Sequence, residues 1–173
     1  MEEFTICFPL NSNYSDHISK WVEFAARKQV KKLKLDLGVK LPVHDNESSY
    51  EGFLASQGST TSSTRLYWLT DLYLRGVDVD DEAMECLISN SPFIERLHVI
   101  DSQKLHKLEA ADPASNLKYL ELRHCENLRH LVISAPNLDI IKLFMSHRLT
   151  VVNISAPILS RISLGAYCYE NFR

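Results

Sequence analysis

Histidines crowd the second half of the chain and stand near a cysteine, a combination that can bind zinc or form a Cys–His nucleophile. The spacings between successive histidines are 8, 18, 6 and 17 residues, in the set His98, His106, His124, His130 and His147, with Cys125 among them. These spacings match no metal-ligand motif, and most of the histidines fall at outward positions of predicted strands. We therefore expect surface or turn histidines, with no bound metal.

A second group of residues that could bind a cation is acidic and comprises Asp78, Asp80, Asp81 and Glu82. It directly precedes four apolar residues at helical spacing, Ala83, Met84, Leu87 and Ile88. Acidic side chains favour the first turn of a helix, which explains the cluster without a metal. The chain has five glycines, none of them in a phosphate-binding loop. The sequence thus predicts a protein that is not an enzyme, with no catalytic residue and no cofactor.

The elements that carry these residues are set by a recurring phrase of apolar residues, Leu-x-x-Leu-x-Leu. It begins at Leu69, Ile94, Leu117, Leu138 and Leu159, and its central positions advance in steps of 25, 23, 21 and 21 residues. This period is the signature of a leucine-rich repeat. Such repeats stack into a solenoid with a broad open face, which favours binding of another macromolecule over catalysis.

A second phrase of the same type begins halfway through each coil, at Leu105, Leu128 and Leu149. In both phrases the last two apolar residues are two apart, which is the strand period. Turn signals separate the phrases, at Asp112-Pro113, Ala135-Pro136-Asn137 and Ala156-Pro157. Each coil after residue 104 is therefore expected to contain two short strands and no helix.

The N-terminal part is predicted to contain helices. We expect a strand at 4–8, a helix from Asp16 to about Gln29, a strand at 30–37 and a helix that ends at Asn90-Ser91-Pro92. The phrase lapses for 39 residues between Leu33 and Leu72, and the polar stretch 55–65 is predicted to be a mobile loop. The predicted fold is an α/β leucine-rich-repeat solenoid, a single domain over 1–173. Its strand-rich coils curve, with the helices on the convex side of the N-terminal coils.

Composition limits the function and the compartment. The formal charge of −3, without a long basic run, does not suggest nucleic-acid binding, and no apolar run is long enough to span a membrane. The start, Met1-Glu2-Glu3-Phe4, lacks a secretory signal, and the four cysteines are widely spaced with no C-x-x-C pair. We expect a reducing location, cytoplasmic or nuclear.

Three segments of the chain resemble plant F-box/LRR proteins of the type often followed by an FBD domain. Residues 76–97 are similar to that family's "GV-x-(V/I)-(T/D)-D-E" to "C-P-x-L-E-x-L" segment, although Ser91 stands where the family usually has Cys. Residues 124–138 resemble its "C-x-N-L-x-x-L-x-I-x-A-P-N-L", and residues 15–37 resemble its early "H-(I/V)-x-x-W" segment. Nothing in the sequence resembles the F-box or the FBD segment.

The resemblance implies a non-catalytic module that recognises a protein client for an SCF-type (cullin-RING) ubiquitin ligase. A Skp-type adaptor would bind only if an F-box were supplied elsewhere. Two alternatives stay open: a truncated F-box/LRR remnant that joins no ligase, or a free-standing leucine-rich interaction scaffold.

The expected partner face consists of the residues that alternate with the inward leucines, because neighbouring strand residues point to opposite sides. Aromatic and arginine side chains often anchor protein interfaces, although each residue alone could be an ordinary solvated strand position. The predicted partner-binding residues are Lys34, Tyr73, Arg75, His98, Glu121, Arg123, Lys142 and Phe144, with Arg161 and Ser163 beside them.

Overall fold

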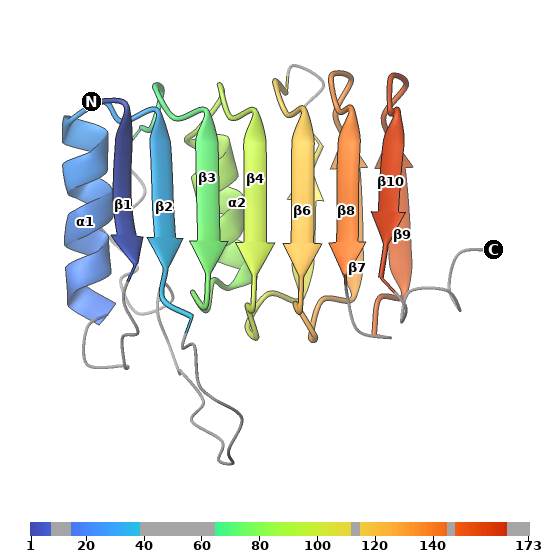
Figure 1. Cartoon of the computed structure of the whole chain (residues 1–173). Helices are drawn as coiled ribbons and strands as arrows, with labels where there is room; N and C mark the ends of the chain where they lie inside the picture. The colour runs from blue at the N-terminus through green and yellow to red at the C-terminus, as the bar shows by residue number, and fades with distance from the viewer. Residues whose placement is uncertain (8–14, 39–64, 112–114, 145–147, 166–173) are drawn as a thin grey trace, which may run out of the picture.

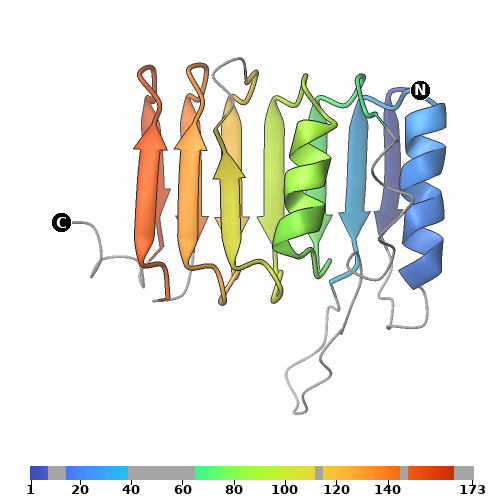
Figure 2. The same ribbon diagram turned by 180° about the vertical axis from the view of Figure 1, so that it is seen from behind.

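The computed structural model describes residues 1–7, 15–38, 65–111, 115–144 and 148–165. Two parallel β-sheets lie back to back and form the two sides of a stack of coils (Figures 1 and 2). The predicted loop at 55–65 lies outside the described residues except for Arg65. The predicted α/β leucine-rich solenoid is confirmed.

The larger sheet has seven strands in the order β1-β2-β3-β4-β6-β8-β10. Their bounds are β1 Glu3–Cys7, β2 Lys32–Asp36, β3 Asp71–Arg75, β4 Arg96–Ile100, β6 Tyr119–Arg123, β8 Ile140–Phe144 and β10 Arg161–Leu164. The smaller sheet has the order β5-β7-β9, with β5 Lys107–Ala110, β7 His130–Ser134 and β9 Val151–Ser155. The strands of the two sheets run in opposite directions, so each C-terminal coil passes down one sheet and up the other (Figure 2).

The repeated phrase sets the register of the larger sheet. Leu72 pairs with Leu97, which pairs with Leu120, so the same position of successive coils forms an unbroken inward row. The first residue of four phrases closes a tight turn, because its N–H donates to the carbonyl three residues earlier, at Leu69, Ile94, Leu138 and Leu159; the Leu138 N–H, for example, donates to the Ala135 carbonyl at 3.2 Å. The half-coil phrase forms the smaller sheet in the same way, which confirms the prediction of two strands per coil.

Two helices lie behind the larger sheet, both in the N-terminal part of the stack (Figure 2). The helix α1 spans Ser15–Arg27 and ends two residues earlier than predicted, because Gln29 adopts a left-handed φ of 53° that stops the helix. The helix α2 spans Asp81–Ser89. Its N-cap Asp80 accepts the Ala83 N–H at 2.9 Å, which explains this acidic residue as a cap.

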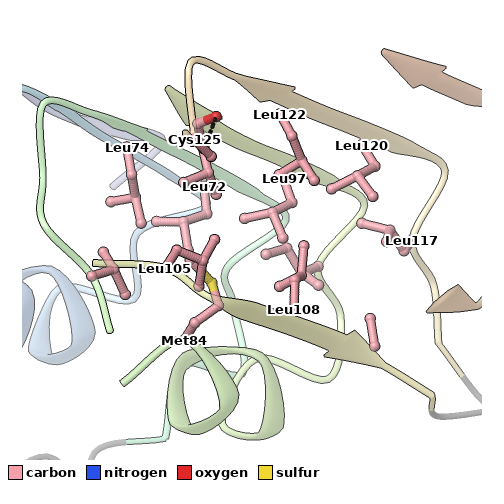
Figure 3. Packing of buried hydrophobic residues seen from close by; sticks show 14 of the residues in the cluster. Leu72, Leu74, Met84, Leu97, Leu105, Leu108, Leu117, Leu120, Leu122 and Cys125 are labelled. Atoms are coloured by element: carbon pink, nitrogen blue, oxygen red, sulfur yellow. Dashed lines mark hydrogen bonds between the residues drawn. The ribbon is translucent and has the colours of Figure 1, made fainter. Parts of the chain in front are cut away.

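The core lies between the two layers and is almost entirely aliphatic. Figure 3 shows Met84 reaching from α2 toward Leu105 while leucines of the larger sheet enter from the other side. Leu97 and Leu120 are 1% and 0% exposed, respectively, whereas Ile162, which pairs through Ile141 with Leu120, is 53% exposed. The burial of equivalent residues therefore falls sharply at β10, the last described strand.

The corner that follows the large-sheet strands needs a left-handed residue in three successive coils. Gly76, Asp101 and His124 have φ values of 63°, 56° and 51°. At Gly76 a Cβ atom would approach the backbone nitrogen of Gly38 to 2.7 Å, so only glycine fits. One residue further on, Cys125 is 0% exposed and packs as a small apolar residue, and burial raises the pKa of its thiol to about 12.

The 39-residue lapse in the phrase does not interrupt the sheet. The strands β2 and β3 are hydrogen-bonded neighbours, with Leu33 paired to Leu72 and Leu35 to Leu74. The first helix-bearing coil therefore stacks directly on the next one, and no strand lies between them. The register of the sheet is therefore continuous across the lapse.

Candidate partner-binding face

The outer face of the larger sheet places all eight predicted partner-binding residues on one surface. One row, a single residue from each strand, runs across it in the order Thr5, Lys34, Tyr73, His98, Glu121, Lys142 and Ser163. A second row, two residues further along the strands, contains Asp36, Arg75, Ile100, Arg123 and Phe144. We refer to these residues, together with the preceding row from Glu3 to Arg161, as the sheet face.

Glu121 occupies the centre of the sheet face and is buried although it points outward, with an exposed fraction of 6%. Its carboxylate accepts hydrogen bonds from the Tyr119 hydroxyl at 2.6 Å and from His98 Nδ1 at 3.0 Å, and it contacts the Arg123 guanidinium. Burial alone would raise the pKa of Glu121, but these three donors outweigh it and hold the pKa below its usual value. Glu121 is therefore ionised and already engaged by three donor side chains.

The ionised carboxylate fixes the protonation of His98. A carboxylate only accepts hydrogen bonds, so the His98 Nδ1 facing it must carry the proton, and in the neutral ring Nε2 is left as an acceptor. Burial lowers the pKa of His98, and the attraction of Glu121 only partly offsets it. Neutral His98 thus serves as part of a rigid platform near pH 7.

Aromatic rings form the platform on both sides of His98. The ring centroids of Tyr73 and Tyr119 lie 5.4 and 4.8 Å from that of His98, both in tilted arrangements. Lysine amines stand over the outer rings: Lys34 Nζ is 4.9 Å from the Tyr73 centroid, and Lys142 Nζ is 5.3 Å from that of Tyr119. Rings with few rotatable bonds and fixed neighbours lose little entropy when a partner binds, which suits a recognition surface.

Ion pairs flank the platform. Arg75 approaches Asp101 at 3.3 Å and Asp36 at 3.9 Å, whereas Arg96 Nη2 donates to Asp71 at 3.0 Å. At the far side the guanidinium of Arg123 lies 4.6 Å from the centroid of the Phe144 ring, which is partly buried. These contacts hold long side chains in place across neighbouring coils, and they make the face continuous from β2 to β8.

Sequence reasoning missed Tyr119, Asp71 and Arg96, which occupy the row of outward positions nearer the strand starts. The available signal was the strand period itself, since each outward residue has another two positions away. The prediction named the central row, part of the row beyond it and, in the row nearer the strand starts, only Arg161. Tyr119 matters most, because it contacts both His98 and Glu121.

The remaining histidines are dispersed. His124 is a left-handed corner residue, His130 is exposed on β7, and the His106 N–H donates to Asp81 at 2.7 Å; His147 lies outside the described residues. Asp78 likewise accepts the Gln103 N–H at 3.0 Å, so the acidic cluster ties the coil of α2 to the next coil. Among the described residues no three His, Cys, Asp or Glu side chains are placed to hold a metal, and no helix is long and apolar enough to cross a membrane.

A family model described as "At1g61320/AtMIF1, LRR domain" matches the chain over residues 2–169. No curated protein and no solved structure matches it. Leucine-rich-repeat domains are generally protein-binding modules, and the parallel-strand solenoid agrees with this match.

Proposed function

Because the chain belongs to the leucine-rich-repeat family described as At1g61320/AtMIF1, LRR domain, we propose that it is a protein-recognition module whose sheet face binds the client. The observation that carries the proposal is the Tyr73–His98–Tyr119 platform, held by the buried carboxylate of Glu121. An isolated solvated strand position needs no such support. Three rings, a carboxylate engaged by three donors and two amines over rings form one pre-organised surface of the kind that anchors interfaces.

A pull-down with matched variants tests the sheet face. Tyr73→Ala/Glu121→Ala/Phe144→Ala removes three side chains from the face, and the control Glu109→Ala/Val132→Ala/Asn153→Ala removes three outward side chains from the smaller sheet. Circular dichroism first checks that both variants fold. The proposal expects partner recovery to fall at least about tenfold for the first variant and to stay near wild type for the control. Unchanged recovery with the first variant would exclude the sheet face.

The finer proposal is that the client is presented to an SCF-type ubiquitin ligase in the cytoplasm or nucleus. It is supported by the resemblance of residues 15–37, 76–97 and 124–138 to plant F-box/LRR proteins. In this proposal the Skp-type adaptor is bound through an F-box on the same polypeptide or on a partner. The alternatives are a remnant without ligase assembly and a free-standing interaction scaffold.

Co-precipitation of the endogenous gene product separates these possibilities. Recovery of a Skp-type adaptor and a cullin together with the client supports the ligase role, and a fluorescent fusion shows the compartment. Client without adaptor supports the scaffold. A purified chain that does not melt cooperatively and binds no client supports the remnant.

A further inference from the structure

We propose that the sheet face binds an acidic, extended peptide segment of its partner, with Lys34 and Lys142 holding carboxylates at the two ends of the aromatic platform. The inference rests on the proposed recognition function and names the chemistry of the partner. It follows from the distribution of charge on the sheet face, from the cations that have no carboxylate partner, and from the distance that separates the two lysines.

Positive charge is concentrated on the sheet face of a chain that is negative as a whole. The outward strand positions carry four acidic side chains, Glu3, Asp36, Asp71 and Glu121, against seven basic ones: Lys32, Lys34, Arg75, Arg96, Arg123, Lys142 and Arg161. The face therefore has three more positive than negative charges, whereas the whole chain has a formal charge of −3. Such an asymmetry steers an oppositely charged partner toward one side of the molecule.

The opposite side of the stack lacks this excess. Outward positions of the smaller sheet carry one lysine and one glutamate, Lys107 and Glu109, which pair with each other at 3.0 Å. The helix α2 exposes Glu82 and Glu85 and has no basic residue in its last turn. An acidic partner is thus attracted to the sheet face more strongly than to the smaller sheet or to α2.

The arginines of the sheet face are largely neutralised, but the lysines are not. Arg75, Arg96 and Arg123 each pair with a carboxylate. Within the described part of the chain, Lys34 and Lys142 form no ion pair; Lys34 stands over the Tyr73 ring, and Lys142 stands over the Tyr119 ring and hydrogen-bonds with the Tyr119 side chain. A carboxylate brought by a partner would meet an amine whose position is already restrained by a tyrosine ring, and it would not have to displace an internal anion.

The geometry sets the length of the segment. Lys34 on β2 and Lys142 on β8 stand four strands apart in the same row. At about 4.8 Å per strand the separation is about 19 Å, which an extended peptide covers in about six residues. The platform between them offers ring faces, so the middle of the segment should be aromatic or apolar and its ends acidic.

A protein segment fits this face better than a nucleic acid does. A phosphodiester backbone is favoured by a continuous cationic track, whereas here the carboxylates of Asp36, Asp71 and Glu121 are interleaved with the cations. The amines of Lys34 and Lys142 stand on the two sides of the aromatic platform, and the rings lie between them. Spaced carboxylates on a peptide match this arrangement.

Fluorescence anisotropy with the whole chain and three labelled nonapeptides tests the proposal. The first peptide has two glutamates at each end and glycine alternating with phenylalanine between them; the others replace the glutamates by glutamines or by lysines. We expect the glutamate peptide to bind at least about tenfold more tightly than the glutamine peptide at low salt, and the lysine peptide to bind most weakly. The preference should shrink at about 0.5 M salt.

A matched pair of variants locates the binding. Lys34→Glu/Lys142→Glu should lose the preference for the glutamate peptide, whereas Lys107→Glu/Arg129→Glu makes the same charge change on the other side and should keep it. If circular dichroism shows that the first variant does not fold, Lys34→Gln/Lys142→Gln replaces it and should weaken the glutamate peptide at least about fivefold.

The contrary outcomes are distinct. Equal binding of the three peptides, or an equal effect of both charge variants, overturns the acidic partner, while the triple-alanine pull-down still tests the recognition face separately. Tighter binding of a 20-nucleotide single strand that is lost in the Lys34→Glu/Lys142→Glu variant would assign the face to nucleic acid. Self-association in ultracentrifugation that disappears in that variant would make the occupant a second copy of this chain, not a separate partner.

Discussion

Alanine substitution at the same repeat position in two different coils should lower the free energy of unfolding by unequal amounts. Leu120 and Ile162 lie in the same inward row, joined through Ile141, but they are 0% and 53% exposed, respectively. Substitution by alanine removes three carbon atoms in each case. The two side chains are isomers of equal size, so the pair differs chiefly in its surroundings.

The magnitudes follow from burial. Leu120→Ala loses the full transfer free energy of the removed groups and leaves a cavity in a closed core, so the free energy of unfolding should fall by about 3–4 kcal/mol. For Ile162→Ala, about half of the side chain is already in contact with solvent. At roughly 0.8 kcal/mol for each fully buried carbon the loss is about 1 kcal/mol, and no closed cavity forms.

Urea denaturation followed by circular dichroism measures both losses, with wild type as the reference. A difference of about 2 kcal/mol between the variants supports the structure. Losses that agree within about 0.5 kcal/mol would refute the reasoning, because they would mean that Ile162 is as fully packed as Leu120.

Three further predictions concern the charge network and the corners. The folded-state pKa of His98 lies below its ordinary value, so the unfolded chain binds more protons than the folded chain as the pH falls. The contribution of neutral His98 to the free energy of unfolding should be fully present above about pH 6.5 and should decrease as the pH drops below that value. Urea titrations at several pH values should show this decrease for wild type and a flatter profile for His98→Gln. Asp81→Ala leaves the N–H groups of His106 and Lys107 without their acceptor and should lower the free energy of unfolding by about 1–2 kcal/mol. Asp81→Asn keeps an acceptor oxygen and should lower it by less in the same assay. Gly76→Ala meets both a left-handed φ and the backbone of the preceding coil, and it should lower the unfolding free energy by more than about 1 kcal/mol; a wild-type midpoint would contradict the corner geometry.

The sequence predicted most of the fold because its information is periodic. The spacing of Leu72, Leu97 and Leu120 specifies the inward row, and the half-coil phrase specifies the second sheet. The continuity of the sheet from β2 to β3 was not predictable from spacing, because a long connection can leave the register of its flanking strands unchanged. The end of α1 also depended on the backbone of Gln29, a residue without a strong stop signal.

The sequence predicted which residues lie on the sheet face, but not the contacts that they make with one another. Strand alternation assigned Tyr73, His98 and Glu121 to the outer surface. It did not reveal that Glu121 is buried there, since that burial arises from the side chains of Tyr119, His98 and Arg123 folding over it. Burial of a polar outward residue depends on neighbours from adjacent strands, which one strand's sequence does not specify.

Site-specific photo-crosslinking tests the central claim most directly. A benzophenone amino acid is placed at Ile100 on the sheet face, or at Asn153 on the smaller sheet, and each labelled chain is irradiated in an extract of cells that express the protein. Binding through the sheet face predicts a discrete protein adduct from position 100 and none from position 153. The same adduct from position 153, with none from position 100, would contradict it.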